Sequence, residues 1–297
     1  MHTYMKAIGF SKKESQAELE ALVKESVIQS DSVQKIAKPN GNIFVEYQKS
    51  YGENFGVIVR GEEDSNGTFH IGTYFPYLKS SFEEGVSEEE IFIHKKVDSD
   101  AYTGMCDDNH LGVSLIFYLQ NIENNIKAGD IGVTVNNGKI KLTSLSSSGK
   151  IILPTQKRIY SHIASKIDNA VKNQMMDDAK NGDMEALDYL AMNDMDKNAS
   201  LMERIKHEDL FSIVETTFIP YGSESDLYVV LGNIISSRQL QNKVTGELVW
   251  VMKIVCNDIT FETVINSEDL MGFPSPGMRF KGIVWMQGEL ETVEKKP

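Results

Sequence analysis

Three residues in the first half of the chain carry side chains that could bind a metal or attack a substrate. Cys106 and His110 flank two aspartates and an asparagine, and His94 stands earlier in the same region. Zinc accepts thiolate and imidazole ligands, and nearby carboxylates can orient an imidazole by hydrogen bonding. A cysteine beside a histidine can also serve as an activated nucleophile. Cys106, His110 and His94 are therefore the candidate metal or catalytic residues.

The spacing of these candidates does not match the established site motifs. The sequence has no Cys-x-x-Cys pair and no His-Glu-x-x-His segment, which are typical of zinc sites. A polar loop that leads into a buried strand explains the same residues without any site. We therefore assign no catalytic residue, metal or cofactor from the sequence, and an enzyme or metal site around Cys106 and His110 stays an alternative.

Two further segments resemble ligand-binding loops only in part. Residues 62–67 place acidic side chains at calcium-loop positions, but Thr73 stands where a bidentate glutamate is required. Residues 146–150 resemble the end of a phosphate-binding loop, but Ile151 stands where a hydroxyl residue is required. Each segment is predicted to be a turn.

The charge of the chain bears on its partners. The sequence has 30 basic and 43 acidic residues, a net charge of −13, and each of its parts is acidic. A protein that binds phosphate backbones usually concentrates lysine and arginine on one surface. The composition therefore disfavours nucleic acid as a partner and leaves protein partners open.

The apolar segments and the cysteines favour a cytoplasmic location without membrane contact. The first ten residues lack a basic head followed by a long apolar run, and the best apolar block, 111–119, is too short to span a bilayer. Cys106 and Cys256 lie in segments that we expect to be separate domains. Free thiols are the simplest interpretation of such a pair.

Sequence periodicity divides the chain into residues 1–153, 154–209 and 210–297. In the middle segment, apolar residues such as Ile159 and Ile163 recur at spacings of three and four, which predicts helices. On both sides the period changes to two, which is typical of strands. The sequence thus predicts an α+β fold, with a β-rich N-terminal domain, a helical connector and a small C-terminal β-domain.

The N-terminal domain is predicted to begin with an amphipathic helix. Ser11 and Glu14 match a capping box, so we place this helix at about residues 11–29. Asn136-Asn137-Gly138 predicts a hairpin turn between the last two strands. The expected strands are 43–47, 55–59, 69–78, 91–97, 111–120, 131–135 and 139–145.

The C-terminal domain is predicted to close as a small antiparallel barrel. A helical turn at 267–270 fits the order of oligonucleotide-binding barrels, so an OB-like domain is expected. Single-stranded nucleic acid would require exposed aromatic rings, and the acidic balance instead favours Trp250 and Trp285 as core residues. Binding of single-stranded nucleic acid by this barrel is a further alternative. The expected strands are 211–219, 227–236, 247–256, 259–266 and 278–291.

Several segments resemble those of a bacterial family of unknown function. The resemblance is carried by residues 112–121, 218–222 and 279–285, together with the opening segment 5–10. It implies a cytoplasmic bacterial protein and supplies no site residues. The two strand-rich halves and the absence of an assembled catalytic signature make a non-catalytic cytoplasmic binding or scaffold protein the leading hypothesis.

Overall fold

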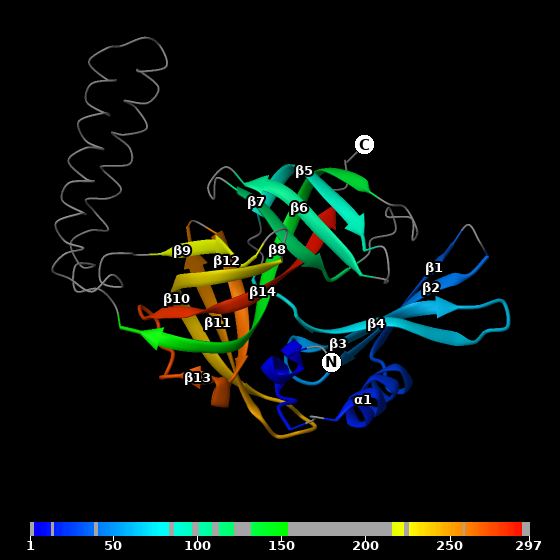
Figure 1. Ribbon diagram of the computed structural model, residues 1–297, viewed down its shortest axis with the longest axis horizontal. Coiled ribbons are helices and arrows are strands. Elements are labelled where there is room, and N and C mark those ends of the chain that lie inside the picture. The colour runs from blue at the N-terminus through cyan, green and yellow to red at the C-terminus, as the bar shows by residue number, and fades with distance from the viewer. Residues whose placement is uncertain are drawn as a thin grey trace, which may run out of the picture. The chain divides into compact units, whose positions relative to one another are not determined.

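The structure is a computed structural model that divides the chain into two compact units (Figure 1). One unit consists of Met1–Ile152 with Thr216–Pro297, and the other of Leu153–Glu215. The helical connector predicted for residues 154–209 lies outside the described residues. The structure describes residues 3–12, 15–38, 41–82, 86–96, 101–108, 113–121, 132–153, 216–222, 226–257 and 259–292.

The described part of the chain is mainly β-structure. It contains one α-helix, α1 (Gln16–Ile28), and two short 3-10 helices, η1 (Thr3–Ile8) and η2 (Ser267–Asp269). The strands are β1 (Ser32–Ala37), β2 (Ile43–Ser50), β3 (Phe55–Glu63), β4 (Phe69–Leu78), β5 (Val86–Lys95), β6 (Tyr102–Asp108), β7 (Val113–Leu119), β8 (Val133–Ile152), β9 (Thr217–Pro220), β10 (Leu227–Gln241), β11 (Leu248–Cys256), β12 (Ile259–Asn266), β13 (Leu270–Met271) and β14 (Arg279–Thr292).

The predicted α+β class is therefore wrong, because the described part of the chain is mainly strand. Strands also occupy positions that the sequence pattern left as loops, namely β1 and β6. β1 lies at the edge of its sheet and is exposed or half-buried along its length. Because neither face of such a strand is fully buried, its sequence shows little hydrophobic alternation. Among the described residues, no helix is long and apolar enough to cross a bilayer.

The strands form two sheets. β1 to β4 make a four-stranded antiparallel sheet in sequence order. The other sheet has ten strands and is organised around β8 and β14, which run side by side as the long green and red strands of Figure 1. The strand pairing forms two closed rings, and both rings contain β8 and β14. One ring is β8-β12-β11-β10-β14, and the other is β8-β5-β6-β7-β14.

The prediction of a self-contained, antiparallel, OB-like barrel at residues 210–297 is also wrong. β10, β11, β12 and β14 do lie in one ring, but β8 from the first half of the chain completes it. β8 pairs parallel to β12 and antiparallel to β14. Because β14 extends over 14 residues, its unpaired edge needs a long partner, and the 20-residue β8 is such a strand.

The predicted hairpin at Asn136-Asn137-Gly138 is absent because β8 continues through it. Gly138 pairs with Thr292 of β14 and with Glu88 of β5. A Cβ atom at this glycine would lie 2.4 Å from Ile91 Cδ1, so the glycine permits close packing instead of a turn. Residues 146–150, also predicted as a turn, lie within the same strand.

The helix α1 begins one turn later than predicted. Its N-cap is Ser15, whose side chain accepts a hydrogen bond from the Glu18 amide while the Glu18 side chain accepts from the Ser15 amide. Ser11 and Glu14 match the same capping-box pattern, so the local sequence alone offered two starting points. The helix buries Leu19, Leu22 and Val23.

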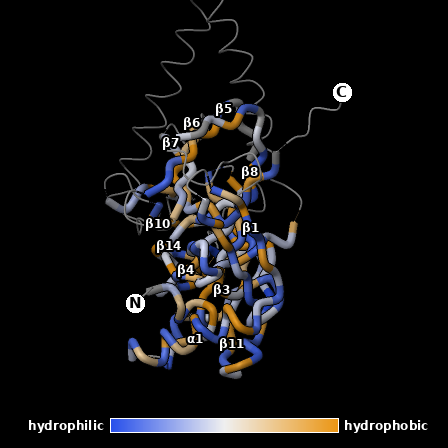
Figure 2. The backbone as a smooth tube through the Cα atoms, turned by 90° about the vertical axis from the view of Figure 1, so that its right-hand side faces the viewer, coloured by the Kyte–Doolittle hydropathy of each residue, from blue (hydrophilic) through white to orange (hydrophobic). Residues whose placement is uncertain are grey.

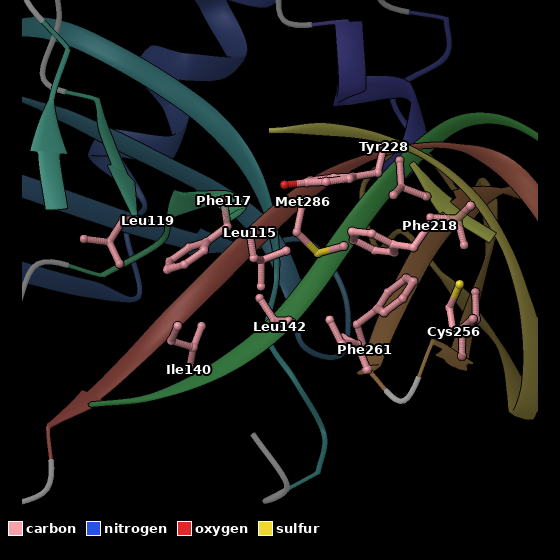
Figure 3. Close-up of a cluster of buried hydrophobic side chains, with 14 of the residues drawn as sticks. Leu115, Phe117, Leu119, Ile140, Leu142, Phe218, Tyr228, Cys256, Phe261 and Met286 are labelled. Carbon is pink, nitrogen blue, oxygen red and sulfur yellow. The ribbon is translucent and has the colours of Figure 1, made fainter. Parts of the chain in front are cut away.

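Two hydrophobic cores hold the structure together. One fills the two rings, and Figure 3 shows part of it, where Leu119 lies at one end, Leu142 near the middle and Cys256 at the other end. The other lies between the four-stranded sheet, α1, η1 and the outward-facing side chains of β8, β11, β12 and β14. Figure 2 shows hydrophobic and hydrophilic residues alternating along the strands, as expected where the two faces of a sheet have different surroundings.

A buried polar network joins the two sheets. Arg60 of β3 is fully buried, and its Nε donates to Glu46 Oε2 at 2.7 Å. Its Nη2 donates to the backbone oxygen of Gln120 at 2.7 Å, at the end of β7. The guanidinium also lies 4.8 Å from the ring centroid of Phe75. Gln120 Nε2 donates in turn to the backbone oxygen of Leu78 at 2.8 Å, so the network ties the four-stranded sheet to the ten-stranded one.

Candidate functional site

The structure does not bring Cys106 and His94 together. In the ladder between β5 and β6, His94 stands opposite Thr103. Because side chains alternate along a strand, Cys106 of β6 lies on the opposite face from Thr103 and hence from His94. Cys106 is 1% exposed within the core of the rings, whereas His94 is exposed. His110 lies outside the described residues.

Cys106 and Cys256 are both buried, and neither is part of a disulfide bond. Cys256 Sγ donates to the backbone oxygen of Thr217 at 3.1 Å and to that of Leu231 at 3.3 Å. Burial raises the pKa of the Cys256 thiol to about 12, so its nucleophilic thiolate form is disfavoured. Within the described ranges, no group of three His, Cys, Asp or Glu side chains is placed to hold a metal ion.

The two tryptophans lie in the cores, which confirms that part of the sequence analysis. Trp250 is 8% exposed and Trp285 is 4% exposed. Trp285 stacks on Tyr4 with ring centroids 5.4 Å apart, and Phe273 packs edge-on against Trp250 at 4.8 Å. Neither indole therefore presents a free face on which a nucleic acid base could stack.

A surface pocket of about 280 Å³ lies where the N-terminal segment meets the start of β11 and the end of β12. Its walls are the paired ends of the β11–β12 hairpin and, from the far end of the sequence, the N-terminal segment. A volume of this size is slightly below the usual range for small-molecule sites, which is about 300–1,000 Å³. The lining residues are Lys12, Thr245, Gly246, Glu247, Leu248, Asn266, Ser267 and Glu268.

The turn between β10 and β11 forms the first wall, and its local sequence explains its shape. Asn242 Oδ1 accepts hydrogen bonds from the amides of Val244 and Thr245, at 2.9 and 3.1 Å. Gly246 has φ of +74°, a left-handed conformation that costs glycine little. Thr245 and Gly246 therefore lie in a turn, as their composition indicates.

The N-terminal segment is hydrogen-bonded to this turn. Asn242 Nδ2 donates to the Ile8 carbonyl at 2.8 Å, and Thr245 Oγ1 donates to the Gly9 carbonyl at 2.6 Å. Gly9 has φ of +87°, and a Cβ atom there would lie 2.9 Å from Asn242 Cβ. The close approach therefore requires glycine, and it carries Lys12 to the edge of the pocket.

Asn266, at the end of β12, holds the third wall in place. This side chain is 1% exposed. Its Nδ2 donates to Glu247 Oε2 at 2.8 Å, and its Oδ1 accepts from the Glu268 amide at 3.0 Å as the N-cap of η2. Asn266 therefore connects both glutamates of the pocket to the framework.

Glu247 is the most constrained charged group of the pocket. Its Oε2 accepts from the Ser11 amide at 3.2 Å and from Asn266 Nδ2. Its Oε1 is buried and has no hydrogen-bond partner among the described residues, which costs about 1–3 kcal/mol for a buried polar group. Glu268 is exposed at the rim, as is Lys12. Two carboxylates and one ammonium group thus line the pocket.

A second polar cluster lies between the residues that follow β4 and the outer face of β12. Glu262 is 1% exposed. Its Oε2 accepts from the Ser81 amide at 2.8 Å, while its Oε1 accepts from Ser81 Oγ at 2.8 Å and from Arg238 Nη1 at 2.7 Å. Both carboxylate oxygens are therefore occupied, and the cluster fastens the residues after β4 to the ring.

Sequence reasoning did not single out Lys12, Glu247 or Asn266. The local signals were present, because Thr245-Gly246 predicts a turn and residues 267–270 predict a helical turn. Neither signal shows that the N-terminal segment reaches these turns.

Comparison with other proteins gives a family and no function. No curated protein and no solved structure matches the chain. Residues 5–288 match the model of a family described as "Domain of unknown function, E. rectale Gene description (DUF3881)". The match confirms the family of unknown function indicated by the segments quoted above. Because it covers nearly the whole chain, the chain belongs to this family.

Proposed function

We propose that this protein is a non-catalytic cytoplasmic binding protein, and that the pocket lined by Lys12, Glu247 and Glu268 is its ligand site. One observation carries the proposal. Polar side chains from the N-terminal segment and from the paired ends of the β11–β12 hairpin converge on one pocket, and hydrogen bonds fix Glu247 and Asn266 there. Such convergence of a few fixed polar groups is typical of ligand sites.

The chemistry of the walls supports binding over catalysis. The hydroxyl groups are engaged in the framework, since Thr245 Oγ1 donates to Gly9 and Ser267 Oγ accepts from Gln239 Nε2 at 3.4 Å. The lining residues that the structure describes include no thiol or imidazole that could act as nucleophile or general base. Of the two carboxylates, that of Glu247 has Oε1 buried and Oε2 held by two donors. The described lining therefore offers recognition groups and no second accessible carboxylate to pair with Glu268.

The alternatives have less support. The enzyme hypothesis relied on Cys106, whose side chain is buried within the rings. The nucleic-acid hypothesis relied on exposed tryptophans, and both tryptophans are buried. The net charge of −13 opposes it as well.

Amide NMR of the full chain tests the proposal. We expect some members of a library of small polar compounds to shift the amide signals of Gly246, Leu248 and Ser267 in a saturable manner. Glu268→Gln should weaken those shifts, because the carboxylate lies at the rim. Glu90→Gln is the matched control, since Glu90 is an exposed acid on β5. Compounds that bind only elsewhere on the protein would contradict the assignment.

A further inference from the structure

The charge of the pocket indicates what kind of ligand it accepts, and this step rests on the proposed function. We infer that the pocket binds a protonated amine or guanidinium group carried on a short apolar stem. The lining supplies two carboxylates, on Glu247 and Glu268, against one ammonium group on Lys12. A cationic group therefore meets a net attraction at this site, and an anion of the same size meets a net repulsion.

The hydrogen-bonding pattern points to a donor. The two donors that hold Glu247 both bind its Oε2, while Oε1 has no partner within the described part of the chain. Asn266 uses its amide nitrogen on Glu247 and its oxygen on the Glu268 amide. The carboxylate of Glu247 is thus fixed before any ligand arrives, which reduces the entropy lost on binding. Ammonium and guanidinium groups are pure donors and complement the exposed carboxylate of Glu268. The Glu247 carboxylate, whose Oε1 is buried, adds its negative charge beside them.

The apolar part of the ligand has a surface to contact. Leu248 lines the pocket and is 43% exposed, and Val244 in the same turn is 59% exposed. Aliphatic stems of basic groups pack along apolar side chains while the charged head stays with its polar partners. The geometry therefore fits a charged head at the glutamates and a short stem along Leu248.

The test uses probes of matched shape and different charge. n-Butylammonium and n-butylguanidinium are titrated into the full chain, with butyrate as the anionic counterpart and n-butanol as the neutral one. We expect the two cations to shift the amides of Gly246, Leu248 and Ser267, and butyrate and butanol to leave them unchanged. A peptide with a single arginine between alanines shows whether the same site also accepts the basic side chain of a protein.

Charge variants make the result specific. Glu268→Gln should weaken binding of the cations by about two- to fivefold, the range for one exposed ion pair. Lys12→Gln should strengthen it by a similar factor, and Glu90→Gln should leave it unchanged because the charge on β5 is remote and screened. All three positions are exposed, so these variants test charge without removing a buried contact.

The outcomes separate the two proposals. If butyrate shifts the pocket amides and the cations do not, the ligand class is wrong and the pocket is still a binding site. If neither these probes nor the compound library shifts the pocket amides, the proposed function fails and the inference fails with it. Shifts by the cations that survive Glu268→Gln unchanged but vanish in Glu90→Gln would also overturn the inference.

Discussion

Replacing Arg60 by methionine tests whether the buried polar network holds the two sheets together. Arg60 is fully buried, and its partner Glu46 is 8% exposed. Methionine fills similar space but leaves the Glu46 carboxylate without its 2.7 Å donor. Removing one partner of a buried ion pair costs about 3–5 kcal/mol, because the remaining charge is uncompensated. We therefore expect Arg60→Met to lower the free energy of unfolding by about that amount.

A double variant separates the cost of the unpaired, buried Glu46 carboxylate from the loss of packing. In Arg60→Met/Glu46→Leu no charge remains unpaired, and apolar replacements of a whole buried pair are often neutral. The double variant should therefore be more stable than Arg60→Met alone. Lys35→Met is the matched control, because the ion pair between Lys35 and Glu63 lies on the same sheet and is exposed. Loss of this exposed ion pair should change the free energy of unfolding little.

Equilibrium unfolding in urea, followed by tryptophan fluorescence, measures these differences. Trp285 lies in the core between the sheets, so its emission reports their separation. A loss below about 1 kcal/mol for Arg60→Met would refute the reasoning from burial. A double variant whose loss of stability equals the summed losses of Arg60→Met and Glu46→Leu would also refute it, because the two side chains would then not interact.

Three further predictions follow from burial and backbone geometry. Both cysteines should resist alkylation in the native protein and react in urea, because the core covers them. If mass spectrometry detected rapid alkylation of the native protein, the core would open readily and the prediction would be wrong. Gly9→Ala should destabilise the protein by about 1–3 kcal/mol, because φ there is +87°, and thermal unfolding with the same midpoint as the parent would contradict this. Burial raises the pKa of three tyrosines from 10.0 to about 12. Between these pH values the unfolded chain binds fewer protons than the folded one, so the free energy of unfolding should fall as pH rises from about 10 to about 12. A free energy of unfolding that stays constant over this window in urea titrations would contradict those pKa values. The tyrosines are Tyr4, Tyr118 and Tyr228.

Local sequence was sufficient to predict a strand where that strand has one buried face and clear turns at its ends. The strands predicted at 69–78 and 259–266 match β4 and β12. The turn predicted at 62–67 joins β3 to β4, where the Gly67 amide donates to the Asp64 carbonyl at 3.0 Å. The short helical turn after β12 was predicted as well. Period-two alternation and turn residues act over a few positions, so each can be detected without knowing the partners.

Strand pairing lay beyond the reach of the local pattern. Asn136-Asn137-Gly138 has the composition of a hairpin turn, yet β8 continues through it because β5 and β14 pair with it on both sides. The ring that contains β10, β11 and β12 closes on β8, which precedes them by a long stretch of chain. Pairing between distant strands depends on which edges remain open in the folded protein, so the expected separate barrel was wrong.

The candidate site depends still more on tertiary structure. By itself, the sequence determined that most segments alternate as strands, that the chain is acidic and that no motif for catalysis or metal binding is complete. Tertiary structure buried Cys106 and placed His94 on the other face of the sheet. It also brought Lys12, near the start of the chain, to the pocket where the β11–β12 hairpin places Glu247 beside Asn266. Hydrogen bonds from Ser11 and Asn266 fix the Glu247 carboxylate, and such contacts arise only when the chain has folded.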